Sequence, residues 1–203
     1  MKHSVSMGKM PERSSYQEWM RSEGIPIHEA LGGVEDTRLI ERAPWARMGG
    51  RGAFVSLMGL RESGFTGMYV VEIPPGGALN AEKHLYEEIM YVLQGRGTAE
   101  VWQADGGAKK TFEWGAGSLF APPLNTWHRL YNVSPEPAIL LGVTTAQIVM
   151  DLYHNAEFVF GDAFHFTDRY NGEQEYFSLD NRIERDSGEH LVWETNFIAD
   201  LRL

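Results

Sequence analysis

The distribution of apolar and polar residues separates a central region of the chain from its two ends. Between about residues 52 and 145, short runs rich in Val, Ile, Phe, Tyr and Trp alternate with breaks of Gly, Pro, Asn and Asp. Such runs, without helical patterns between them, are typical of an all-β sandwich or barrel. The pattern predicts strands at residues 53–60, 66–73, 87–94, 97–103, 109–114, 118–121, 127–133 and 138–144.

Residues 1–51 predict an N-terminal arm rather than part of the regular barrel. Glycine and proline recur from Gly24 to Gly50, a composition that favours irregular structure. A short helix is expected over residues 16–21, with Ser14 or Ser15 as its cap. Trp45 is the apolar anchor of the arm, and arms of this kind often pack on a neighbouring subunit.

Residues 146–203 predict a mixed C-terminal extension. The spacing in 146–155 favours a helix with Ile148, Val149 and Leu152 on one stripe. The remaining tail is aromatic and charged, with no clear period. Because its last residues are apolar, we expect the tail either to pack on the barrel or to connect to a further domain.

Charge and cysteine content narrow the classes of function. The formal net charge of -10 argues against binding to nucleic acid or to an anionic membrane surface. The chain has no cysteine, which excludes disulfides, thiolate nucleophiles and cysteine-ligated metals. No apolar run approaches about 18 residues, and the start does not resemble a secretory signal. These features predict a soluble, acidic, cytoplasmic protein.

The stretch EKHLYEEIMYVLQGRG, residues 82–97, carries the first candidate functional residues. If the chain is extended here, Glu82 and His84 project to the same face, because strand residues two apart share a face. The same period places Glu88 on the inner face of the next strand. Lys83 and Glu87 would then point outward into solvent.

A second histidine, His128, lies on a distant predicted strand after a Pro/Asn turn. Two histidines and one or two carboxylates that converge on a cavity form a good divalent-metal site. His84, Glu88 and His128 make a two-histidine, one-carboxylate set, and Glu82 could add a fourth oxygen ligand. Aromatic residues of the barrel, including Tyr69 and Trp114, are expected to serve chiefly in packing.

The spacing of these residues resembles the cupin superfamily, whose members are jelly-roll β-barrels with an internal metal. The first cupin motif has a glycine, five residues, His-x-His, three or four residues, Glu, six residues and Gly. The second has a glycine, five residues, Pro-x-Gly, two residues, His, three residues and Asn. The matching residues are Gly76, Glu82, His84, Glu88 and Gly95 in the first, and Gly117, Pro123, Asn125, His128 and Asn132 in the second.

Two positions depart from the motifs. Asn125 replaces a turn glycine, which is a mild change because asparagine tolerates the left-handed conformation. Glu82 replaces the first histidine, and its role is open between a metal ligand, a residue that orients His84, a catalytic general base and a solvated charge. The resemblance covers roughly residues 66 to 145 and implies a jelly-roll barrel that holds a metal.

The resemblance implies several chemistries, since this barrel serves many unrelated functions. Oxygen ligands favour Fe(II) or Mn(II), with Zn or Ni as alternatives. The first hypothesis is a dioxygenase-type oxidoreductase acting on a small oxygenated substrate, aromatic ones included. The alternatives are a metal-dependent lyase, isomerase or decarboxylase with Glu82 as base, and a small-molecule-binding barrel without catalysis. The arm and extension exceed what one barrel requires, and we expect them to cover it or to build a homodimer.

Overall fold

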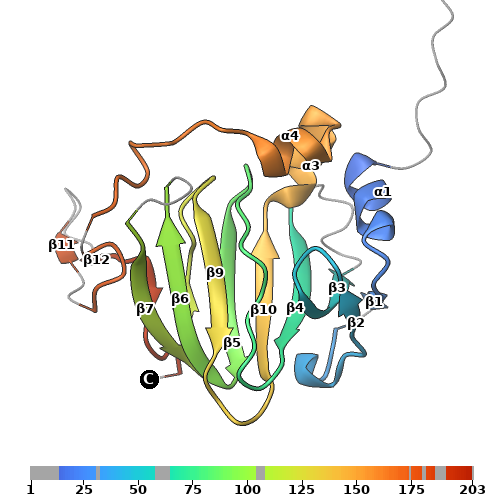
Figure 1. The fold of residues 1–203 in the computed structure, drawn as a ribbon, viewed down its shortest axis with the longest axis horizontal. Helices are drawn as coiled ribbons and strands as arrows, with labels where there is room; N and C mark the ends of the chain where they lie inside the picture. The colour runs from blue at the N-terminus through green and yellow to red at the C-terminus, as the bar shows by residue number, and fades with distance from the viewer. Residues whose placement is uncertain are drawn as a thin grey trace, which may run out of the picture.

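Two β-sheets face each other in the computed structural model (Figure 1), which describes residues 14–30, 33–57, 65–103, 108–173, 175–179, 182–185 and 191–202. Their strands pair in antiparallel fashion, except that the first strand of the larger sheet runs parallel to its neighbour. The larger sheet has the order β1-β3-β4-β10-β5-β8-β13, with β2 paired to β3. The smaller sheet has the order β7-β6-β9. Strands distant in sequence thus become neighbours, as in the predicted jelly roll.

The strands of the larger sheet are β1 (Ile27–Ala30), β2 (Ala43–Trp45), β3 (Gly50–Leu57), β4 (Gly67–Ile73), β5 (Glu88–Gln94), β8 (Leu119–Phe120), β10 (Ala138–Thr144) and β13 (Phe197–Ile198). Those of the smaller sheet are β6 (Arg96–Trp102), β7 (Lys110–Gly115) and β9 (Trp127–Asn132), and a separate hairpin joins β11 (Arg182–Arg185) to β12 (Leu191–Glu194). Each predicted strand is present, so the all-β prediction is confirmed. The first begins three residues before the predicted start, at Gly50, because its beginning pairs with β2 of the arm. Residues 58–60 of that prediction lie outside the described residues.

Apolar side chains from both sheets fill the space between them. The buried cluster between the sheets takes alternate residues of the strands, because strand residues two apart share one face. Its members include Val71, Met90 and Leu140 from the larger sheet and Ala99, Trp114 and Leu130 from the smaller one. On the opposite face of the larger sheet, a second buried cluster includes Ala53, Val70 and Ile139.

The α-helices of the described residues gather at one end of the larger sheet (Figure 1). They are α1 (Ser15–Ser22), α3 (Ala146–Tyr153) and α4 (Ala156–Gly161), and a 3-10 turn, η1, spans Thr37–Leu39. The side chain of Ser14 accepts a hydrogen bond from the backbone N–H of Gln17, so the predicted first helix and its cap are confirmed. No helix among these described residues is long and apolar enough to cross a membrane.

The helix predicted at 146–155 is present, but of its predicted apolar stripe only Val149 packs against the core. Ile148 and Leu152 are 38% and 66% exposed, whereas Ala146 and Met150 are buried. The helix follows directly from the last residues of β10, and this junction turns the Ala146/Met150 side toward the core. The order of apolar residues along one short helix could not distinguish the two orientations.

The N-terminal arm and the tail both pack on the barrel. Trp45 is 1% exposed, and its ring lies 5.3 Å from the rings of both Phe54 and Tyr69, so it anchors the arm to its own barrel. In the tail, β13 pairs with β8 through Phe197 and Phe120. The described part of the tail therefore packs on the barrel, the first of the two alternatives expected.

Candidate metal centre

The two motif segments are joined by backbone hydrogen bonds between Glu82 and His128. The N–H of each residue donates to the C=O of the other, at 3.0 and 2.9 Å, in an isolated antiparallel bridge. Directly opposed residues of an antiparallel pair project their side chains to the same face. His84 is tied to the second motif as well, because its C=O accepts from the N–H of Asn125 at 3.0 Å.

Asn125 holds the turn before β9 in the left-handed conformation, with φ 51°, as expected for a residue that replaces a turn glycine. Its side-chain amide donates to the carbonyl oxygens of Asp162 and Phe164, at 3.2 and 2.8 Å. The segment after α4 is thereby attached to the end of the barrel at which β9 begins, next to His128.

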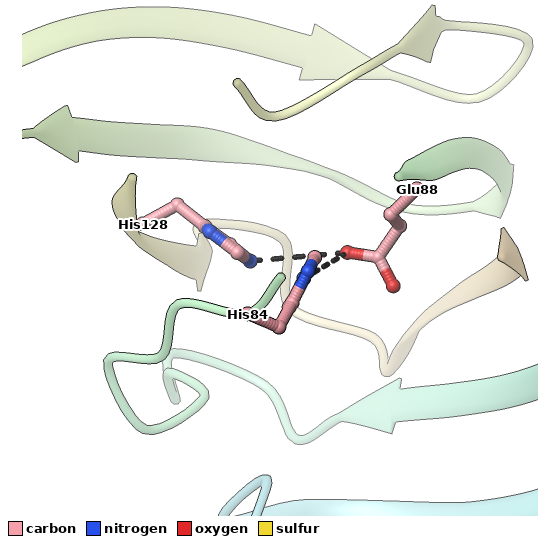
Figure 2. Close-up of side chains that lie close together, drawn as sticks. All are labelled: His84, Glu88 and His128. Atoms are coloured by element: carbon pink, nitrogen blue, oxygen red, sulfur yellow. Dashed lines mark ion pairs between the residues drawn. The ribbon is translucent and has the colours of Figure 1, made fainter. Parts of the chain in front are cut away.

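His84, Glu88 and His128 converge inside this end of the barrel (Figure 2). The Oε2 atom of Glu88 lies 3.4 Å from His84 Nε2 and 3.8 Å from His128 Nε2. The potential ligand atoms of the three residues all lie within 4.8 Å of one another. The side chains are almost completely buried, at 2%, 1% and 5% exposure for His84, Glu88 and His128. The structure therefore brings together the predicted two-histidine, one-carboxylate set.

The hydrogen bonding of these residues fits a bound cation. His84 Nδ1 lies 2.8 Å from the C=O of Tyr86, and His128 Nδ1 lies 3.0 Å from the C=O of Thr126. A carbonyl can only accept, so each Nδ1 carries the proton and each Nε2 keeps a lone pair. His84 Nε2, His128 Nε2 and Glu88 Oε2 have no hydrogen-bond partner among the described residues.

Three buried polar atoms without partners that face a common point are costly unless a further group binds them. Imidazole and carboxylate together suit Fe, Mn or Zn in the divalent state. The residues present therefore fit a divalent metal.

Two tyrosines support the candidate ligands. The Tyr69 hydroxyl donates to Glu88 Oε1 at 2.5 Å, which leaves Oε2 directed toward the histidines. The Tyr86 ring stacks on His84, with centroids 3.8 Å apart and planes 4° apart. The period-two pattern identified Tyr69 only as a packing residue, since a strand pattern does not reveal which polar atom its hydroxyl meets.

The electrostatics of the site keep one histidine neutral. Burial, reinforced by the nearby His84, lowers the pKa of His128. Burial also acts to lower the pKa of His84, but the negative charges of Glu88 and Glu82 outweigh it and raise that pKa. Burial would raise the pKa of Glu88, yet His84, His128 and Tyr69 together lower it. A cation bound between these groups would balance the negative charge of Glu88.

Glu82 lies at the edge of this group. Its Oε1 atom is 3.9 Å from His128 Nε2, but its oxygens are not among the atoms that lie mutually within 4.8 Å. Its Oε2 atom instead accepts a hydrogen bond from Arg47 Nη1 of the N-terminal arm. Arg47 lies 35 residues before Glu82, and nothing in the local sequence pattern indicated the pair.

Lys83 was predicted to face solvent, and this prediction is wrong. It is 7% exposed, and its ammonium group donates to the C=O of Asp162 and lies 5.5 Å from the centre of the Trp127 ring. It does point away from the metal ligands, but the segment after α4 covers it. Glu87 is exposed as predicted, with a 3.6 Å ion pair to Arg169.

Comparison with protein-family models matches residues 69–144 to the model described as "Cupin domain". This span includes most of β4, all of β5 to β10 and all four predicted metal ligands. Comparison with curated proteins found no match.

Solved structures provide distant likenesses. An oxalate decarboxylase from Lactobacillus farciminis, solved as its formate complex, is 21% identical over 58% of this chain and 39% of that chain, with a TM-score of 0.44. A mutant of Bacillus subtilis oxalate decarboxylase is 26% identical over 53% of this chain and 29% of that chain, with a TM-score of 0.45. Pumpkin seed globulin is 19% identical over 53% of this chain and 31% of that chain, with a TM-score of 0.44. This chain thus matches well under half the length of each, and likenesses at these scores carry no information about activity.

Proposed function

This chain contains a cupin domain at residues 69–144, and we propose that it is a divalent-metal-dependent oxidoreductase of the dioxygenase type. The proposal is supported by one observation above all. His84, Glu88 and His128 direct three buried, unpartnered atoms at one point. Two histidines and one carboxylate with positions left open are typical of non-haem Fe(II) oxygenases.

The residues of the chain prepare this site in three ways. Backbone carbonyls hold the protons of both imidazoles on Nδ1, and Tyr69 fixes the Glu88 carboxylate. The barrel core keeps water from the inner side. A bound Fe(II) or Mn(II) would supply the redox chemistry that O2 requires, as well as a positive charge to bind an oxygen-bearing substrate.

The approach for a small substrate is on the side of Glu82 and Arg47. Their side chains are 13% and 21% exposed, against 5% or less for the three central residues. Two charged groups at this edge fit a small oxygenated substrate better than a purely apolar one. Cupin barrels typically bind small molecules. The homodimer and the cytoplasmic location remain predictions.

A second function is favoured by the position of Glu82. A carboxylate whose oxygen lies 3.9 Å from His128 Nε2, at the more exposed edge, could move a proton in a lyase or isomerase reaction. Under that alternative, the chain would convert its substrate without O2.

O2 consumption tests the first proposal. The protein would be freed of metal with a chelator, reloaded anaerobically with Fe(II) or Mn(II), and screened with small oxygenated substrates in an oxygen electrode. We expect O2 uptake that depends on both metal and substrate and that is lost in Glu88→Gln. Turnover at an equal rate without O2 would favour the lyase or isomerase instead.

A further inference from the structure

Arg47 stands at the centre of a cage formed by parts of the chain outside the cupin domain. Its guanidinium carbon lies 5.5 Å from the Trp19 ring of α1, 5.0 Å from the Trp45 ring of β2 and 4.7 Å from the Phe160 ring of α4. Arginine stacks favourably on aromatic faces, which restricts its side chain. Its position is therefore set by the arm and by the extension together.

Two carboxylates complete the cage, and each accepts from a different nitrogen of the guanidinium. Arg47 Nε donates to Glu23 at 3.1 Å, and Nη1 donates to Glu82. Glu23 also accepts from the indole N–H of Trp45, so it is held on its own side. Glu23 and the three rings hold the guanidinium in place without any contribution from Glu82. The ion pair therefore sets the position of the Glu82 carboxylate, and Glu82 does not set the position of Arg47.

Glu82 is nevertheless within reach of the metal centre. Its free oxygen lies 3.9 Å from His128 Nε2, nearly the same as the 3.8 Å between Glu88 Oε2 and that atom. The Glu88 oxygen and the His128 nitrogen are spaced as two ligands of one ion. A rotation of the Glu82 carboxylate away from Arg47 would bring a fourth oxygen to the same ion.

From this arrangement we propose that Arg47 is a positioning residue that keeps Glu82 out of the metal's ligand set. The inference rests on the proposed function, since it concerns the same metal. The N-terminal arm thereby determines how many protein ligands the cupin domain offers, and the open positions of a three-ligand site are preserved. The positioning role of Arg47 also explains why position 82 is a glutamate, because a neutral histidine there could not form an ion pair with Arg47.

A double-mutant cycle of metal binding tests this proposal. Mn(II) affinity would be measured by calorimetry on the full-length wild type, Arg47→Met, Glu82→Gln and the double variant. Methionine keeps an apolar stem against the three rings. In the wild-type background, Glu82→Gln should change affinity by less than about threefold, because Glu82 is not a ligand. In the Arg47→Met background it should weaken affinity by about 10- to 100-fold, the size found when the shell of a metal site is altered.

Two further measurements separate ligation from simple charge removal. The visible absorption of the Co(II)-loaded protein should change between the wild type and Arg47→Met, and the change should be absent in the double variant. Arg47→Lys keeps the charge but cannot bridge Glu23 and Glu82 with one planar fork, so it should show part of the same spectral change. It also provides a test if Arg47→Met does not fold.

An equal effect of Glu82→Gln in both backgrounds, with an unchanged Co(II) spectrum, would overturn the role of Arg47 while leaving the proposed function intact. A wild-type protein that binds neither Mn(II) nor Co(II) would instead overturn the proposed function and this inference with it. The two failures are therefore distinguishable.

Discussion

Replacement of Tyr69 by phenylalanine removes one hydroxyl from the metal centre without removing the ring. That hydroxyl donates to Glu88 Oε1 at 2.5 Å and contacts the sulfur of Met90 at 3.4 Å. Tyr69 is 5% exposed and Glu88 is 3% exposed, so water cannot take the place of the lost donor. The ring still packs on Trp45, and the change leaves a void no larger than an oxygen atom.

The expected cost follows from the charge of the acceptor. A hydrogen bond to a charged group contributes about 1.5–3 kcal/mol, and loss of one partner leaves a buried carboxylate oxygen unsatisfied. We therefore expect Tyr69→Phe to lower the free energy of unfolding of the metal-free protein by about 1.5–3 kcal/mol. For a chain of this size that corresponds to a fall of about 3–12 °C in the thermal midpoint. Mn(II) affinity should fall by about 10- to 100-fold, because Tyr69 orients a ligand.

The pH dependence gives the prediction a second signature. Burial acts to raise the pKa of Glu88, but His84, His128 and then Tyr69 outweigh it and lower this pKa in the folded protein. A carboxyl with a depressed folded pKa stabilises the fold above its unfolded pKa, and this stability is lost as pH falls through the folded value. The deficit of Tyr69→Phe should therefore be full near neutral pH and shrink as pH falls below the ordinary glutamate pKa of about 4.3.

Urea denaturation of the metal-free protein at several pH values would measure this deficit. Tyr131→Phe is the matched control, because Tyr131 donates at 2.8 Å to Glu100, whose side chain is 23% exposed and is also paired with Lys109. Tyr131→Phe should lower the free energy of unfolding by less than about 1 kcal/mol. Equal costs for the two variants, or a Tyr69→Phe deficit that does not change with pH, would refute the assigned role of Tyr69.

Three further predictions concern the metal and the arm. Saturation with Mn(II) at about 100 times its Kd should stabilise the fold by about 2.7 kcal/mol, and a chelator should reverse this in a thermal melt. Because a proton on His84 competes with a metal and the pKa of His84 is raised, Mn(II) affinity should fall as pH drops through that raised value, which calorimetry at several pH values would detect. A constant affinity would contradict that competition. Trp45→Ala should cost about 3–5 kcal/mol in urea denaturation, because the ring is 1% exposed, whereas Leu39→Ala, at 81% exposure, should cost little. Similar costs would show that Trp45 does not anchor the arm.

The barrel was predictable because its signals are local. Alternation with period two and breaks at Gly, Pro and Asn are properties of neighbouring residues, and they located the strands of the barrel. The spacing of the two motifs then placed His84, Glu88 and His128 together, since strand pairing fixes which residues face one another. Asn125 took the left-handed conformation for an equally local reason.

The features that were missed depend on packing between distant segments. The period-two pattern places Lys83 on the outer face, where a residue is usually solvated. The segment after α4, far along the chain, covers it instead. Arg47 reaches Glu82 only because α1, β2 and α4 form an aromatic cage at the edge of the site. The spacing of apolar residues in α3 predicted one buried stripe, but the junction of α3 with β10 decides which side of the helix is buried. No period in the sequence encodes such contacts.

Metal stoichiometry tests the central claim most directly. The purified chain would be dialysed against Mn(II) or, anaerobically, Fe(II), passed through a desalting column, and analysed for metal per chain beside His84→Gln and His128→Gln. We expect one bound ion per wild-type chain and almost none in either variant, with the folded state of both verified by circular dichroism. A wild-type chain without metal, or variants that retain the full equivalent, would contradict it.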